Sequence, residues 1–202
     1  LRIQADDFEQ KQQQMLEKTL SGLRTLGHLD NFSLSEKGYW SANLCTNLVL
    51  ELAEIIEGGI LEGASAERLS AIISSICGDE HRQYLKSKES ALAKEEVIKL
   101  SEIIQKVKDL KIPGVPTDRL VINNAAFTVL TWLRCENWQE FRGLLNLSGA
   151  QEGDAARLIT QTAEHLNQLT RLTQTHPQLA LRAEEAKRRI LRPPLTEAIN
   201  LE

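Results

Sequence analysis

The chain has 202 residues, which suits one domain of ordinary size or one domain with a small appendage. A chain of this length buries roughly 70% of its unfolded surface, so it needs no disulfide or metal to fold. The formal net charge of -4 argues against a protein that grips nucleic acid by bulk positive charge, but leaves room for a local site within a larger machine. Aromatic residues are only 4% of the chain, while Leu, Ala, Glu, Gln and Lys dominate, which favours helices.

The cysteines indicate a reducing compartment. Cys45, Cys77 and Cys135 are an odd number without metal-ligand spacing, and each follows or lies within an apolar helical pattern. We therefore expect reduced, buried and inert thiols in a cytoplasmic protein. The sequence contains no apolar run of about 18 residues and no signal-peptide layout, so we expect no membrane partner.

The two ends of the sequence suggest an excised piece of a longer protein. The chain begins at Leu1 without a methionine, and its last two residues, Leu201 and Glu202, are typical of a cloning scar. We therefore expect that a parent protein can carry catalytic machinery that this chain lacks.

The first half of the chain predicts helices interrupted by one small flap. Apolar residues at helical spacing predict a helix over residues 5–26, with Gly27 as its stop. The turn-rich segment that follows predicts a two-stranded flap through Leu29, Phe32 and Leu34. A helix capped near Ser35 is then expected to continue through residues 39–59.

Later segments also predict helices. Ser65 as N-cap and Glu67 in the first turn mark a buried helix within residues 63–81. Residues 83–111 predict one long amphipathic helix, ended by "IPGVPTD". Further helices are expected from residue 118 or 119 to about residue 135, around "WQEFRGLL", over 152–174 and over 177–191, with Pro193 and Pro194 beyond the last. The fold class is thus all-α, a helical bundle with a small β-flap near the N-terminus.

The sequence contains no recognisable catalytic motif. No glycine-rich phosphate loop is present, and neither the histidines nor the serines and cysteines have a metal-binding or nucleophile setting. The "GDEH" of residues 78–81 is similar to a helicase metal box, but its residues are contiguous, so we interpret it as a solvated helix end. We predict no metal site, no cofactor and no enzymatic activity for this chain by itself.

The helix expected over residues 152–174 carries two rows of side chains at helical spacing, one apolar and one polar, which we call its apolar and polar seams. The apolar seam needs only a neighbouring helix to explain it. Its members are Leu158, Ile159, Thr162, Leu166, Leu169 and Leu172. The polar seam advances in steps of four, three, four and three residues, and either a solvated face or a long polar ligand explains it. Its members are Arg157, Gln161, Glu164, Gln168 and Arg171.

Three stretches occur in fixed order: "FSLSEKGYWSANLCTNLVLELAEIIEGGILEGASAERLSAIISSICGDEH", "VLTWLRCENWQEFRGLL" and "QEGDAARLITQTAEHLNQLTRL". Together they resemble the DSHCT domain of superfamily-two DExH-box RNA helicases of the exosome-associated, superkiller type. The resemblance covers roughly residues 5–195. It implies a helical bundle over residues 41–195, preceded over residues 1–40 by the tail of a winged-helix segment.

The resemblance also implies a role. In these helicases a ratchet helix, here about residues 152–174, lies across the path of the single strand, while motor domains of the same protein bind ATP and Mg²⁺. Arg157 occupies the family's arginine position and Glu164 that of a strand-facing acid. Gln161 stands where relatives often carry a basic residue, yet glutamine can still bond a base or a 2′-hydroxyl. The implied partners are single-stranded RNA and the motor domains.

Two other features have competing interpretations. The last helix carries an excess of basic charge that either touches RNA or an acidic neighbour, or merely complements the helix dipole; its residues are Arg182, Lys187, Arg188, Arg189 and Arg192. Trp132 and Trp138 are either stacking platforms for bases or parts of the core.

The sequence thus leaves two functional hypotheses from different classes. The first is an accessory helicase domain that contacts and guides single-stranded RNA during unwinding. The second is a noncatalytic helical module that docks a protein and never meets nucleic acid.

Overall fold

The computed structural model describes residues 2–196, and the predicted all-helical bundle with a small β-flap is confirmed in this part of the chain. Leu201 and Glu202, interpreted above as a cloning scar, lie outside the described residues. The elements are, in chain order, α1 (Arg2–Thr25), β1 (Leu29–Asp30), β2 (Ser33–Leu34), α2 (Glu36–Ser41), α3 (Val49–Glu57), α4 (Ala66–Cys77), α5 (Lys94–Asp109), α6 (Asn123–Arg134), α7 (Trp138–Ser148), α8 (Glu152–Leu169) and α9 (Pro177–Ile190).

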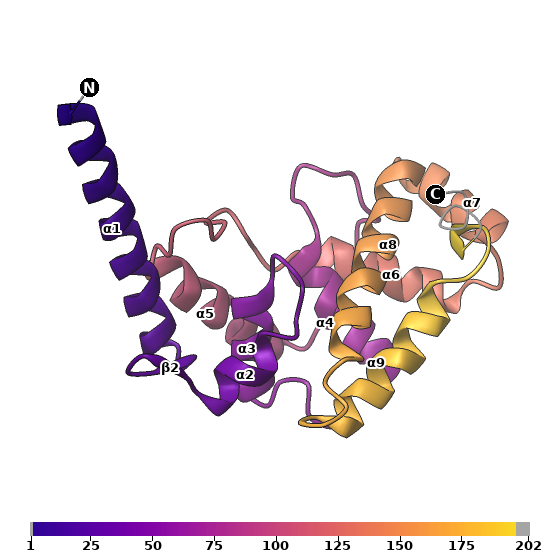
Figure 1. Cartoon of the computed structure of the whole chain (residues 1–202). Coiled ribbons are helices and arrows are strands. Elements are labelled where there is room, and N and C mark those ends of the chain that lie inside the picture. The colour runs from indigo at the N-terminus through magenta and orange to yellow at the C-terminus, as the bar shows by residue number, and fades with distance from the viewer. Residues whose placement is uncertain (1, 197–202) are drawn as a thin grey trace.

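The first helix and the flap lie at one end of the molecule. Helix α1 projects away from the bundle, and the antiparallel strands β1 and β2 pair at its lower end, with Leu29 opposite Leu34 (Figure 1). Ser35 caps α2 as predicted, since its hydroxyl accepts a hydrogen bond from the backbone N–H of Gly38 at 3.0 Å. A side chain at Gly38 would collide with the carbonyl oxygen of His28, so only glycine allows this close approach.

The expected single helix over residues 39–59 is wrong, because the structure divides this segment into α2 and α3. Residues 42–48, which we call the α2–α3 loop, separate the two helices. The backbone N–H of Cys45 donates to the side chain of Gln168 at 3.1 Å, and that of Leu48 donates to the hydroxyl of Thr46 at 3.1 Å. Side-chain acceptors therefore replace the carbonyls that a continuous helix would use.

The predicted helix over residues 83–111 is also too long, since α5 begins only at Lys94. In the preceding segment the backbone N–H groups of Gln83 and Leu85 donate to side chains of Asp154 and Thr128, each at 2.9 Å. The side chain of Leu85 is buried in the core. Tertiary contacts thus hold residues 83–93 in an irregular conformation despite their helix-forming composition.

The remaining helices lie close to their predicted positions, except for two boundaries. Helix α6 begins at Asn123 rather than at residue 118 or 119, because the backbone N–H of Ile122 bonds the carbonyl of Ser75 at 2.8 Å. Helix α8 ends at Leu169, five residues before its predicted end, because the chain turns there, with the backbone N–H of Leu172 bonding the carbonyl of Leu169 at 3.1 Å. Helix α9 ends at Ile190. No helix within residues 2–196 is long and apolar enough to cross a membrane.

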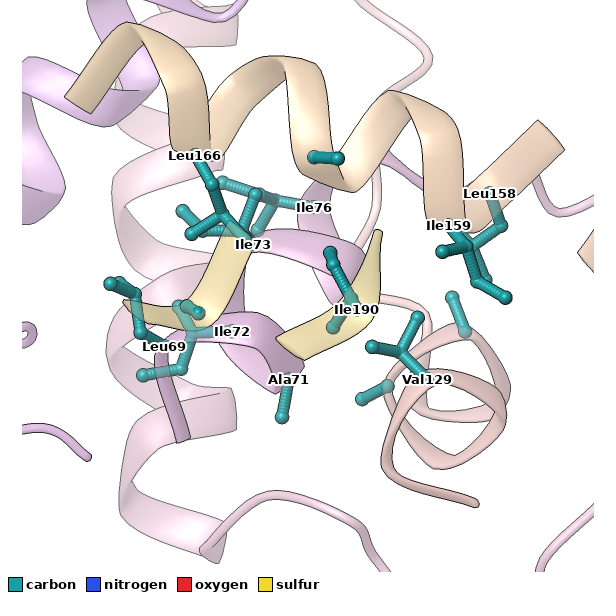
Figure 2. Packing of buried hydrophobic residues seen from close by; sticks show 14 of the residues in the cluster. Leu69, Ala71, Ile72, Ile73, Ile76, Val129, Leu158, Ile159, Leu166 and Ile190 are labelled. Carbon is teal, nitrogen blue, oxygen red and sulfur yellow. The ribbon is translucent and has the colours of Figure 1, made fainter. Parts of the chain in front are cut away.

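The hydrophobic core surrounds α4, which packs against α6, α8 and α9. In Figure 2, Leu166 of α8 points toward Ile73 of α4, while Leu158 and Ile159 lie farther along α8 toward Val129 of α6. The predicted apolar seam of α8 is confirmed, because all of its members are buried: Leu158, Ile159, Thr162, Leu166, Leu169 and Leu172. Burying one face of α8 fixes which face remains available to a ligand.

The two tryptophans contribute to packing. Trp132 is fully buried, and its indole N–H donates to the carbonyl of Ile190 at 2.7 Å. Trp138 is half-buried, with its ring centroid 5.3 Å from that of Trp132 in an edge-to-face arrangement. Core packing is therefore the confirmed interpretation for Trp132, which presents no surface on which a base could stack.

Candidate nucleic-acid interface

The polar seam lies on the face of α8 opposite the core. Arg157 and Glu164 are exposed, and Gln161 is half-buried. Within residues 2–196, none of these three side chains has a hydrogen-bond or ion-pair partner in the same chain. Their polar groups are therefore free to contact a ligand.

The other two members of the polar seam contact the α2–α3 loop. The side chain of Gln168 accepts the hydrogen bond from Cys45 described above, and the guanidinium of Arg171 lies 3.3 Å from the sulfur of Cys45. Arg171 follows the last residue of α8 and the cap residue Thr170, so it extends the seam beyond the helix. The structure thus places four predicted residues on one helix face and the fifth beside the loop.

A surface cavity of about 330 Å³ lies between α8 and the α2–α3 loop. We call it the α8 hollow. Its lining residues are Cys45, Thr46, Asn47, Gln161, Glu164, His165 and Gln168. The hollow brings the middle of the predicted seam into contact with a second wall that is distant in sequence.

His165 belongs to this hollow although the sequence analysis did not select it. Its Nδ1 lies 2.8 Å from the hydroxyl of Thr46. Burial, and secondly the positive charge of Arg119, lower the pKa of the imidazole to about 4. The ring is therefore neutral at physiological pH and adds no positive charge to the hollow. Its position four residues after Gln161, on the same helical face, was a usable signal.

A buried ion pair supports the loop from behind. The Nε of Arg119 lies 3.2 Å from a carboxylate oxygen of Glu51, and its Nη2 donates to the carbonyl of Asn47 at 2.9 Å. Glu51 is only 2% exposed, and this burial raises the pKa of its carboxyl group, while Arg119 acts in the opposite direction. Arg119 thus positions the loop without reaching the hollow's surface.

The acids at the N-terminus of α8 join neighbouring segments. A carboxylate oxygen of Asp154 accepts hydrogen bonds from the backbone of Gln83 at 2.9 Å, and the other contacts Arg82 at 3.2 Å. Glu152 accepts from the indole of Trp138 at 2.7 Å and pairs with Arg142 at 3.0 Å. These carboxylates make the beginning of α8 unsuitable for a phosphate.

The basic residues of the last helix mostly have partners within the chain. Arg182 pairs with Glu185 at 2.9 Å, Lys187 with Glu184 at 2.7 Å and Arg189 with Glu67 at 2.5 Å. These ion pairs reduce the local excess of positive charge on α9.

The remaining two basic residues differ from each other. Arg192 donates to the carbonyls of Trp132 and Cys135, and its guanidinium carbon lies 3.9 Å from the Trp132 ring centroid. Arg188 is exposed and has no partner among the described residues. A role of this patch in RNA contact stays a prediction, with Arg188 as its least engaged member.

The expected burial of all three cysteines is wrong for Cys45, which is exposed because the α2–α3 loop replaces the predicted helix there. Cys135 is buried. Burial raises the pKa of the Cys77 thiol to about 11, although its hydroxyl neighbour Thr162, 3.5 Å away, opposes the shift. Cys77 is therefore protonated and unreactive at neutral pH.

The "GDEH" segment forms a turn at the surface. A carboxylate oxygen of Asp79 accepts a hydrogen bond from the backbone N–H of His81 at 2.9 Å, and the other contacts Arg82 at 3.3 Å. The His81 side chain is 86% exposed. Over residues 2–196 the structure contains no group of three or more His, Cys, Asp or Glu side chains that could hold a metal ion.

Fold and site together define a helical domain with one polar helix face. The chain matches the DSHCT (NUC185) domain family over residues 31–198 and belongs to it. This family consists of C-terminal accessory domains of helicases. The match begins within the segment assigned above to a winged-helix tail, and the boundary near residue 40 stays a prediction. Comparison with curated proteins finds no significant match.

Proposed function

We propose that this domain contacts and guides single-stranded RNA during unwinding, while motor domains of the same protein hydrolyse ATP with Mg²⁺. The observation that supports the proposal most directly is the set of three unpartnered polar side chains on one face of α8, Arg157, Gln161 and Glu164. Membership of a family of helicase accessory domains supports a nucleic-acid strand as the ligand of this face.

The dimensions of the seam suit a strand. From Arg157 to Gln168 it extends over roughly 16 Å at about 1.5 Å per residue, and Arg171 continues it beyond the helix, which is enough to flank several nucleotides. Its mixture of Arg, Gln and Glu favours a strand that must slide, because a row of basic residues alone would hold the phosphates too firmly. Gln168 and Arg171 hold the α2–α3 loop and continue the track.

The test uses the full-length protein that contains this domain. Arg157, Gln161 and Glu164 are replaced together by alanine, and RNA-stimulated ATP hydrolysis is compared with duplex unwinding. A matched control replaces Lys99, Glu102 and Gln105, which are exposed on α5 and have the same residue types, with Lys in place of Arg. Of these three, Gln105 donates to Asp109 one turn later at 2.7 Å. We expect roughly a hundredfold slower unwinding for the α8 variant, with ATP hydrolysis retained, since three polar contacts of about 1 kcal/mol each are lost together. Unwinding equal to that of the α5 control would show that the seam is a solvated face.

A second candidate function is a protein-interaction module without a nucleic-acid role. Exposed apolar side chains on α1 favour it, with Phe8 62% and Leu16 58% exposed on a helix that projects from the bundle (Figure 1). The same experiment separates the two candidates. Under this alternative, alanine at the α8 seam leaves both ATP hydrolysis and unwinding unchanged.

A further inference from the structure

The α8 hollow differs in charge from the two ends of the polar seam. None of the described residues that line it is Lys or Arg, and its one imidazole, that of His165, is neutral. The carboxylate of Glu164 is the only charged group in the lining. Because phosphate groups bind where cations or free backbone N–H groups gather, this hollow suits an uncharged polar group instead.

Basic side chains lie outside the hollow on either side. Arg157 precedes Gln161 by four residues, or about 6 Å along α8, and Arg171, which follows the end of α8, borders the hollow at its other end through the contact with the sulfur of Cys45. A strand whose phosphates meet these two arginines would therefore pass over the hollow between them. The group that it presents there is a base or a sugar.

The hollow contains side-chain amides, which can both donate and accept hydrogen bonds, and one carboxylate, which can only accept them. The side-chain amides of Asn47 and Gln161 have no partner within residues 2–196, and each can donate and accept. An ionised carboxylate can only accept. The amides thus fit many base edges, whereas Glu164 favours a base that offers N–H donors.

We propose that the α8 hollow takes one unstacked nucleobase and that Glu164 selects guanine there. This inference rests on the proposed strand-guiding function. Guanine alone presents two adjacent donors on its Watson–Crick edge, the ring N1–H and the exocyclic amino group, which match the two oxygens of a carboxylate. Adenine and cytosine place a lone pair beside their amino group, and uracil places its N–H between two carbonyl oxygens, so each meets the carboxylate with repulsion.

The test measures binding of the full-length protein to two labelled single strands. One is a uridine strand with guanosine at every third position, and the other carries inosine at those positions, which removes only the exocyclic amino group. We expect the protein to bind the guanosine strand about five- to tenfold more tightly, as one charge-assisted hydrogen bond allows. The near-isosteric Glu164→Gln should lose this ratio, which makes the comparison a double-mutant cycle.

Arg157→Ala provides the matched control. It should weaken binding of both strands alike and leave the ratio between them unchanged, because a phosphate contact carries no base information. If the unaltered protein binds both strands equally, or if Glu164→Gln keeps the ratio, base selection by the hollow is refuted. In that case weaker binding by Arg157→Ala still supports the strand-guiding function. If both variants bind both strands like the unaltered protein, the strand-guiding function fails as well.

Discussion

The amide oxygen of Gln168 accepts a hydrogen bond from the backbone N–H of Cys45 at 3.1 Å, which joins two residues 123 positions apart in the sequence. The contact between His165 and Thr46, at 2.8 Å, joins the same two segments one turn earlier on α8. Together they hold the α2–α3 loop against the helix that carries the polar seam. The hollow between them is therefore a property of the folded chain and not of either segment alone.

Replacing Gln168 by alanine should loosen this loop. The backbone N–H of Cys45 would lose its acceptor, which costs about 0.5–1.5 kcal/mol of the free energy of unfolding. Urea unfolding measures this loss, and hydrogen exchange at the Cys45 amide should become faster. Gln174→Ala is the control, since its side chain is exposed and has no partner within the described residues. Unchanged exchange at Cys45 would mean that the contact does not hold the loop.

Acidification should destabilise the domain through His165. Its folded-state pKa of about 4 lies below the ordinary value of 6.5, so between these two pH values the unfolded chain binds more protons. The free energy of unfolding is therefore fully retained above pH 6.5 and falls as the pH falls toward 4. Between about pH 7 and about pH 5 the loss from this residue is roughly 2 kcal/mol.

The His165→Asn variant isolates this effect, because every other titrating group is common to both proteins. Urea unfolding at the two pH values should give a steeper loss of stability for the unaltered domain than for the variant. Equal losses in the two proteins would show that the His165 imidazole keeps an ordinary pKa in the folded state.

Removing Arg119 should be more damaging than its place outside the hollow suggests. Arg119→Met leaves the carboxylate of Glu51 buried without its counter-charge and the carbonyl of Asn47 without its donor. Breaking a buried pair in this way costs about 3–5 kcal/mol of the free energy of unfolding. The added change Glu51→Gln should recover part of that loss, as thermal or urea unfolding would report. A double variant no more stable than Arg119→Met would contradict an unpaired carboxylate as the cause.

Helical periodicity could predict the faces of α8, but not what lies opposite them. The spacing of Leu158, Leu166 and the other apolar residues fixed the buried face, and the polar seam followed as its complement. The second wall of the hollow comes from residues 42–48, and its position depends on contacts with Gln168, His165 and Arg119. No local pattern encodes such contacts.

The two helices that were predicted too long failed for a related reason. Residues 83–93 contain Lys, Leu and Ala twice each, all good helix formers, yet the backbone N–H groups of Leu85 and Ala91 donate to the side chains of Thr128 and Asn123. Intrinsic propensity is a weak preference, amounting to a few tenths of a kcal/mol per residue, and tertiary hydrogen bonds outweigh it. At Cys45 the backbone N–H likewise bonds the side chain of Gln168, and a loop forms where the apolar pattern indicated a helix.

The cysteines offer a direct probe of where the strand lies. Cys45 is exposed at the wall of the hollow, whereas the thiol of Cys77, with a pKa of about 11, is ionised in only about one molecule in a thousand near pH 8. A thiol-reactive dye should therefore modify Cys45 fast and the buried Cys135 slowly, and Cys45→Ser should remove the fast phase. Saturating single-stranded RNA should slow the fast phase several-fold in the full-length protein, because a strand over the hollow covers this thiol. A rate at Cys45 that RNA leaves unchanged would place the strand elsewhere, even if binding itself is tight.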